Sequence, residues 1–101
     1  MSDLISLQIV SVQRPKFDLG QLVATPNALG ALSPDDFMLA LGRHVQGDWG
    51  ELDREDHSAN ESALKHGGRL FSAYLSTNGV NFWIITECDR SATTVLLPED
   101  Y

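Results

Sequence analysis

The residues best suited to metal chemistry lie in one acidic stretch near the middle of the chain. Its acidic members are Asp48, Glu51, Asp53, Glu55, Asp56 and Glu61. In the helix expected here, Asp53, His57 and Glu61 follow at four-residue intervals and share one face. Carboxylates and an imidazole on one face are ligands for a divalent metal, so a small metal-dependent hydrolase is one interpretation. A solvated, charged helix face explains the same pattern without any ligand.

A second polar cluster, residues 86–94, lies where one expected strand turns into the next. Asp89 and Ser91 are typical turn residues, because their side chains accept hydrogen bonds from nearby backbone amides. Arg90 offers a planar fork of donors, which favours a recognition loop with Arg90 as its anchor. A tight turn with a local ion pair is the alternative interpretation.

A tryptophan, Trp49, stands between Gly47 and Gly50 in an expected turn. Its large apolar area and single N–H are typical of interface hot spots, although a tryptophan can equally fill the edge of a core. We therefore predict one partner-binding surface with these members: Asp48, Trp49, Glu51, Glu55, Asp89 and Arg90. Carboxylates around an aromatic anchor would steer a partner with a basic surface.

The remaining residue types suggest no catalytic site. His44 and His66 each lie near an expected helix C-terminus, where a cation is favourable. No Ser/His/Asp or Cys/His spacing singles out a nucleophile, so the sequence favours a protein without catalytic activity and without a cofactor. The single cysteine, Cys88, excludes an intrachain disulfide and suits a reducing compartment.

Composition limits the fold and the partners. The chain has 101 residues, 43% of them hydrophobic, which predicts one domain over 1–101. The net charge of -7 opposes approach to phosphate, so we expect no direct binding of duplex DNA or of an anionic membrane. No apolar run approaches the roughly 18 residues of a transmembrane helix, and no signal peptide is recognisable. A cytoplasmic location is therefore expected.

The positions of the elements follow from alternation and from capping residues. Alternating apolar residues predict strands over 5–12 and 17–23. Capping side chains and prolines predict one or two helical turns over 26–31, a helix from Pro34 to near Gly47, and another from Asp53 to Gly67. Two helices and a strand-rich remainder indicate an α+β domain.

The C-terminal third predicts a hairpin and a further strand. Asn78-Gly79 is typical of a two-residue type I′ turn. That turn would pair Leu75 with Phe82 and place four apolar side chains on one face: Phe71, Leu75, Phe82 and Ile84. Tyr74 and Trp83 would meet on the other face, as core or as an interface. With a strand over 93–97, we expect an antiparallel sheet with a C-terminal three-stranded meander, packed against two helices.

Three segments resemble a known family. They are FDLGQLVATPNAL (17–29), GDWGELDREDHSANESAL (47–64) and WIITECDRSATTVLLPEDY (83–101). They resemble short plasmid-related bacterial proteins, which are borne by plasmids, phages and integrative elements. The resemblance begins at Phe17 and implies that residues 1–16 are a variable N-terminal segment. Cys88 stands where this family would have a small residue such as alanine, so it is a poor candidate for a required nucleophile. The resemblance implies a mobile genetic element and supplies no mechanism.

Together these features favour a small acidic protein that acts by occupying the surface of a host protein. By analogy with small acidic proteins of mobile elements, the expected partners are host defence or nucleic-acid-handling machinery. Spaced carboxylates could also mimic the phosphates of a nucleic acid. A homodimer is compatible with the same reasoning.

Overall fold

Three helices and a four-stranded sheet form the fold in the computed structural model, which describes residues 14–101. In chain order the elements are β1 (Gln21–Ala24), α1 (Pro26–Ala31), α2 (Pro34–Val45), α3 (Arg54–His66), β2 (Leu70–Leu75), β3 (Asn81–Thr86), β4 (Ala92–Leu96) and the one-turn helix η2 (Pro98–Asp100). The expected α+β class is confirmed. The strand expected over 5–12 lies outside the described residues.

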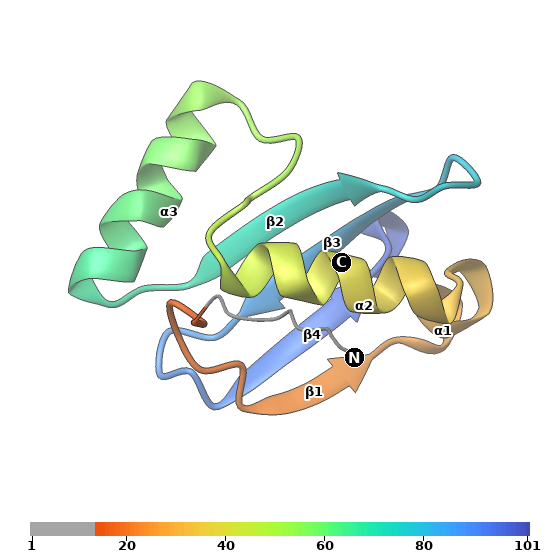
Figure 1. The fold of residues 1–101 in the computed structure, drawn as a ribbon, viewed down its shortest axis with the longest axis horizontal. Helices are drawn as coiled ribbons and strands as arrows, with labels where there is room; N and C mark the ends of the chain where they lie inside the picture. Colours follow the sequence, from red (N-terminus) through yellow and green to blue (C-terminus); the bar gives the residue numbers. More distant parts are fainter. Residues whose placement is uncertain (1–13) are drawn as a thin grey trace, which may run out of the picture.

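The sheet has the strand order β1-β4-β3-β2 (Figure 1). β2, β3 and β4 pair antiparallel, as expected for the C-terminal meander. The expectation of a wholly antiparallel sheet is wrong, because β1 pairs parallel with β4. The helices carry the chain from β1 back across the sheet, so β1 and β2 run in the same direction. Two successive hairpins then give β4 that direction as well.

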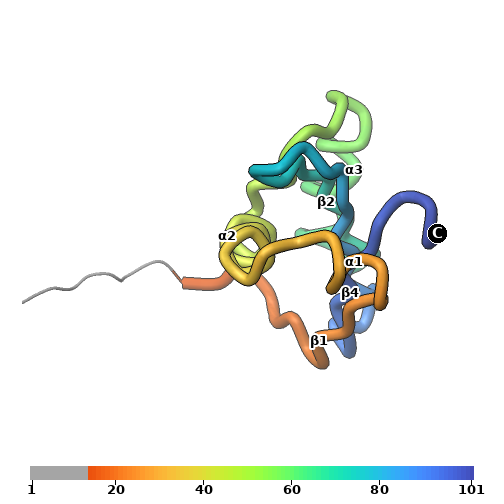
Figure 2. Tube along the Cα trace, turned by 90° about the vertical axis from the view of Figure 1, so that its right-hand side faces the viewer, coloured from red at the N-terminus to blue at the C-terminus, as the bar shows by residue number. Residues whose placement is uncertain are grey.

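The helices take different places around the sheet. Figure 2 shows α2 against one face and the C-terminal segment on the opposite side, while α3 lies beyond β2. The hydrophobic core fills the layer between α1, α2 and the sheet; its buried members are Ala28, Leu32, Ala40, Leu41, Tyr74, Phe82, Ile84, Val95 and Leu97. Within residues 14–101, no helix is long and apolar enough to cross a membrane.

The helix starts predicted from capping residues are confirmed. A side-chain oxygen at each cap accepts a hydrogen bond from the backbone N–H three residues on, which satisfies one otherwise unpaired donor. The pairs are Thr25 with Ala28, Ser33 with Asp36, and Asp53 with Asp56. Proline at the first position of α1 and α2 suits the helical φ value.

The turn between β2 and β3 has three residues instead of two. The N–H of Gly79 donates to the carbonyl of Ser76 at 3.0 Å, and Ser76 N–H donates to Val80 at 2.9 Å. Gly79 has a φ of 85°, the left-handed conformation that closes a three-residue loop with a bulge. The expected two-residue turn is therefore wrong.

The extra turn residue shifts the whole hairpin register by one. Phe82 pairs with Tyr74 and not with Leu75. Since side chains alternate along a strand, a one-residue shift moves each side chain of one strand to the other face relative to its partner. Phe71 and Leu75 consequently lie on the face opposite Phe82 and Ile84, so the predicted grouping of these four residues is wrong.

The outer edge of β2 is covered by two other segments. The side-chain amide of Asn60 donates to the carbonyl of Phe71 at 2.5 Å, and its oxygen accepts from Phe71 N–H at 3.0 Å. Ala73 exchanges hydrogen bonds with Trp49 O at 3.1 Å and with Glu51 N at 2.7 Å. These contacts satisfy an edge that would otherwise be open to pairing, and they attach α3 to the sheet.

Candidate functional site

The structure buries the tryptophan at the centre of the predicted partner surface. Trp49 is only 1% exposed, and its indole N–H donates to the carboxylate of Glu61 at 2.7 Å. Its ring stacks on Phe17, with ring centroids 6.2 Å apart, and meets the His44 ring edge-on at 5.7 Å. Trp49 therefore fills the core, which was the alternative interpretation, and it offers no exposed anchor to a partner.

Arg90 acts within the fold instead of projecting from a recognition loop. Its guanidinium donates to four backbone carbonyls, those of Ala63, Gly68, Glu87 and Cys88. Two of these carbonyls, those of Ala63 and Gly68, lie in and just beyond the last turn of α3. Arg90 thus ties the end of α3 to the turn between β3 and β4. Among residues 14–101, it alone has a positive φ, 61°, without being glycine.

Replacing Arg90 should loosen this tie. Arg90→Ala is expected to lower the free energy of unfolding by about 2 kcal/mol, because hydrogen bonds from a charged donor are lost. Arg90→Lys should recover less than half of that loss, since one ammonium cannot reproduce the planar fork. Urea denaturation measures both variants. Arg54→Ala, at an exposed position on α3, is the control; an unchanged midpoint for Arg90→Ala would contradict the role assigned here.

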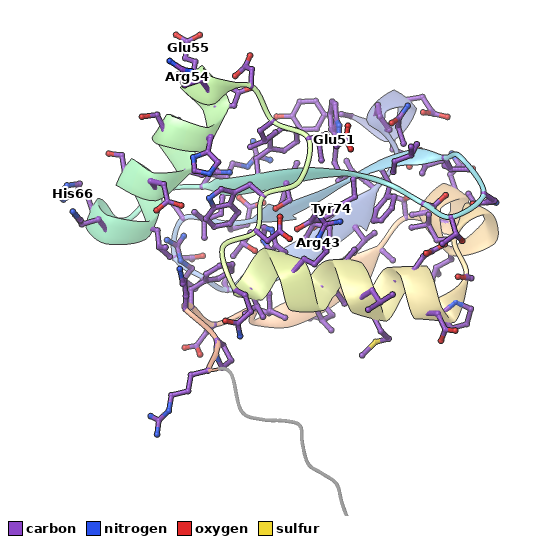
Figure 3. All side chains as sticks on the ribbon, turned by 45° about the horizontal axis from the view of Figure 1, so that its top comes forward. Arg43, Glu51, Arg54, Glu55, His66 and Tyr74 are labelled. Carbon is purple, nitrogen blue, oxygen red and sulfur yellow. The ribbon has the colours of Figure 1, made fainter. Side chains whose placement is uncertain are left out.

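The other predicted partner residues are not gathered in one place. Asp89 accepts a hydrogen bond from the N–H of Ser91 at 3.0 Å, and hydrogen bonding to Ser91 lowers the pKa of Asp89. It is the turn residue that the simpler interpretation expected. Glu55 projects from the first turn of α3, well away from Arg43 and Tyr74, as Figure 3 shows. Only Asp48 and Glu51 remain beside α2.

The three residues of the metal interpretation do not converge. Asp53 caps α3, with its carboxylate on the N–H of Asp56 at 2.8 Å, and Glu61 accepts the indole of Trp49. His57 is exposed on the same helix. In the described part of the chain, no three histidine, cysteine or acidic side chains are grouped so as to hold a metal ion. The geometry gives the hydrolase alternative no support.

Two strongly exposed apolar residues lie on the outer side of α2. Met38 is 67% exposed and Leu39 66%, whereas Leu41 on the inner side is buried against the sheet. A helix that is apolar on opposite sides is typically covered on both. The sheet covers only one side of α2.

The exposed apolar area on the outer side of α2 continues onto α1. A hollow between α1 and α2 reaches from Met38 to Leu29, and a groove beside Leu39 separates α2 from Tyr74 and Thr77 of the β2–β3 hairpin. A third hollow, along the outer side of α2, contains both Met38 and Leu39. We call this continuous area the α2 surface. Its apolar members are Leu29, Met38 and Leu39.

A charged cluster borders the α2 surface where α2 ends. Arg43 Nε lies 2.7 Å from Asp48 Oδ2, and the guanidinium sits 4.6 Å from the centre of the Tyr74 ring. Figure 3 shows Arg43 and Tyr74 pointing toward one another. Tyr74 donates its hydroxyl to the carbonyl of Asp48 at 2.6 Å, and burial raises the pKa of Tyr74 to about 12. The hydrogen bond from Arg43 lowers the pKa of Asp48, which keeps Asp48 anionic.

The turn that carries Asp48 is fixed by a glycine. Gly50 has a φ of 78°, and a Cβ at this position would lie 2.1 Å from the carbonyl oxygen of Ala73. Only glycine allows the turn to approach β2 this closely. This approach holds Asp48 against Arg43 and Tyr74. The Gly47 and Gly50 spacing indicated a turn, but not that it would press against β2.

A buried polar network joins α2 to the sheet, and the sequence did not reveal it. His44 Nδ1 lies 2.5 Å from Ser72 Oγ, and His44 Nε2 lies 2.8 Å from Thr86 Oγ1. Thr86 Oγ1 lies 2.7 Å from Thr93 Oγ1, and the Thr93 hydroxyl donates to the carbonyl of Leu19 at 2.7 Å. Both threonine hydroxyls and the serine hydroxyl are fully buried.

The last bond of this network determines the direction of the others. Since Thr93 donates onward, its oxygen accepts from Thr86, and Thr86 accepts from Nε2–H of His44. Nδ1 is then the acceptor for the Ser72 hydroxyl. Every donor is satisfied with His44 neutral, and burial, with a smaller contribution from the charge of Arg90, lowers its pKa to about 4. The expectation of a cationic His44 at the helix end is therefore wrong.

Ser72 and His44 are in hydrogen-bond contact, as a nucleophile and its general base would be, but solvent and substrate cannot reach them. Both side chains are 0% exposed, so no substrate can reach the serine oxygen. The network instead fixes how α2 sits on the sheet. His44 follows Phe37, Ala40 and Leu41 at helical spacing, and this periodicity is the sequence signal that could have placed it on the inner face.

Comparison with known proteins finds no family model, curated protein or solved structure that matches the chain. The resemblance to plasmid-related proteins therefore stays a prediction. The functional argument rests on the α2 surface and the charges around it.

Proposed function

We propose that this protein is a small acidic binding domain that acts by docking its α2 surface onto a partner protein. The observation that carries this proposal is the exposure of Met38 and Leu39, both about two-thirds exposed, on a helix whose other side is already packed. Apolar patches of this kind, rimmed by polar residues, mark interaction sites on soluble domains. Of the partner surface predicted from the sequence, Asp48 and Glu51 remain in the proposed interface. Met38 and Leu39 on α2 replace Trp49 as its apolar centre.

The charges around the α2 surface favour a basic partner. Asp48 neutralises Arg43, which leaves the exposed carboxylates of Asp35 and Glu51 at the border. The whole chain carries a net charge of -7, which steers a basic surface toward it. The resemblance to proteins of mobile elements implies that the partner is a host protein, with defence or nucleic-acid-handling machinery as the expected class.

A matched pair of substitutions tests the proposal. Leu39→Glu places a charge in the α2 surface, whereas Leu22→Glu makes the same change on β1, where Leu22 is 51% exposed. We expect the immobilised wild-type protein and Leu22→Glu to retain the same stoichiometric host protein. Leu39→Glu should retain it at least about tenfold less well, because a carboxylate would be desolvated in the interface. Equal melting temperatures would show that both variants are folded.

Charge and oligomeric state provide the second part of this test. Asp35→Lys and Glu51→Lys should slow association with the captured protein, and the difference from wild type should shrink as salt rises. Unchanged capture by Leu39→Glu would overturn the proposal. So would a homodimer of the purified protein that Leu39→Glu converts to a monomer, because the occupant of the α2 surface would then be a second copy of the chain.

A further inference from the structure

A second hollow lies on the other face of the sheet, away from the α2 surface. It measures about 270 Å³ and is lined by Arg69, Phe71, Trp83, Ile85 and Tyr101. These side chains come from β2, β3, the residue before β2 and the C-terminal residue. In Figure 2 this side of the sheet carries the C-terminal segment, whereas α2 covers the other side.

Three of the five residues that line this hollow are aromatic. The rings of Phe71 and Trp83 meet edge-to-face with centroids 5.1 Å apart, and those of Trp83 and Tyr101 do so at 5.8 Å. Ile85 is buried beneath them, whereas Trp83 is only partly buried and Tyr101 is exposed. Such a surface attracts a further planar aromatic ring through stacked or edge-to-face contact.

Arg69 is the one charged residue of the described chain, 14–101, that lines the hollow. Its guanidinium lies 5.7 Å from the centre of the Tyr101 ring, and Nη1 donates to the Tyr101 hydroxyl at 2.9 Å. The ion pair with Glu87 is loose, at 3.8 Å, and both side chains are about half exposed, so water screens it strongly. Arg69 therefore has donors left for an anionic group at the rim.

We infer that this hollow binds a planar aromatic group that carries a carboxylate, with the ring against Trp83 and the carboxylate on Arg69. Its volume is below the usual range for drug-sized ligands, which favours one or two fused rings. The group could belong to a free aromatic acid or to an aromatic residue at the C-terminus of a peptide. This site is independent of the docking function proposed for the α2 surface.

The two tryptophans allow a direct measurement. The indole N–H signals of Trp49 and Trp83 in a ¹H–¹⁵N spectrum can be told apart through Glu61→Gln, which removes the acceptor of Trp49. Titration with indole-3-acetate should shift the Trp83 signal saturably, with a Kd of about 1 mM or lower. The Trp49 signal should stay in place. Indole-3-acetamide, which lacks the charge, should bind at least about fivefold more weakly.

A matched pair of variants isolates the carboxylate contact. Arg69→Gln should abolish the preference for the acid over the amide. Arg54→Gln makes the same charge change at the start of α3, where Figure 3 shows Arg54 far from the sheet, and should keep the preference. An unmoved Trp49 signal shows that Arg69→Gln is folded.

A tripeptide ending in tryptophan, with a free or an amidated C-terminus, distinguishes the two sources of the ligand. Preferential binding of the free-terminus peptide assigns the hollow to protein C-termini, and binding of the small acid alone assigns it to free aromatic acids. A Trp83 signal that neither probe moves, or a preference that survives in Arg69→Gln, overturns the inference.

Discussion

An Ile84→Asp variant is expected to lose the folded state at room temperature. Ile84 is 0% exposed at the centre of β3, between Ser72 on β2 and Val95 on β4. A carboxylate there would lose its hydration without gaining a partner, which costs several kcal/mol, and burial of the isoleucine, about 2–3 kcal/mol, would also be lost. Together these losses approach the roughly 5–15 kcal/mol by which domains are stable. Circular dichroism should show no cooperative thermal transition.

Two further substitutions in β3 separate burial from other causes. Asn81→Asp adds the same side chain at an exposed position of β3 and should leave the melting temperature nearly unchanged. Ile84→Val removes one methylene group from the core and should cost about 1 kcal/mol. An Ile84→Asp protein that melts like the wild type would contradict the placement of Ile84 in the core.

Features that depend on neighbouring residues could be predicted from the sequence. Each helix start is a short-range event, in which Thr25, Ser33 or Asp53 binds an N–H three residues ahead. The C-terminal meander likewise follows from two short turns. The turn at Asn78-Gly79 was located correctly, but its length was not. A glycine with positive φ suits both a two-residue turn and a three-residue turn with a bulge, and only packing of Tyr74 and Phe82 against α2 selects between them.

Features that depend on distant residues could not be predicted. The parallel pairing of β1 with β4 joins residues about seventy positions apart. The candidate site also depends on contacts between residues that are distant in the sequence. Trp49 is buried because Phe17 and Glu61 enclose it, and Arg90 turns inward because the end of α3 lies within reach. The helical spacing of Phe37 and Leu41 indicates an apolar side of α2, but it could not show that Met38 would lie on the side that the sheet leaves uncovered.

The buried network of His44 predicts a specific loss of stability in mild acid. Burial lowers the pKa of His44 from 6.5 to about 4 in the folded protein. Below pH 6.5 the unfolded chain therefore binds a proton that the folded protein does not, so the free energy of unfolding falls as the pH falls. The slope approaches about 1.4 kcal/mol per pH unit, and the total loss by pH 4 is about 3 kcal/mol. Below pH 4 both states carry the proton, and this contribution stops changing.

Urea denaturation of the wild type and of His44→Gln between pH 7 and pH 4.5 measures this effect. Glutamine keeps a donor and an acceptor for Ser72 and Thr86 but cannot be protonated, so the variant should be less stable at pH 7 and nearly independent of pH in this window. Asp36 and Asp100 have lowered pKa values in the fold, and an aspartate ordinarily has a pKa of 3.8. The stability that they contribute is therefore lost mainly below pH 4.5, outside this window. His57→Gln, at an exposed position, should keep the wild-type slope. If His44→Gln kept the wild-type dependence of the unfolding free energy on pH, a group other than His44 would cause the loss of stability.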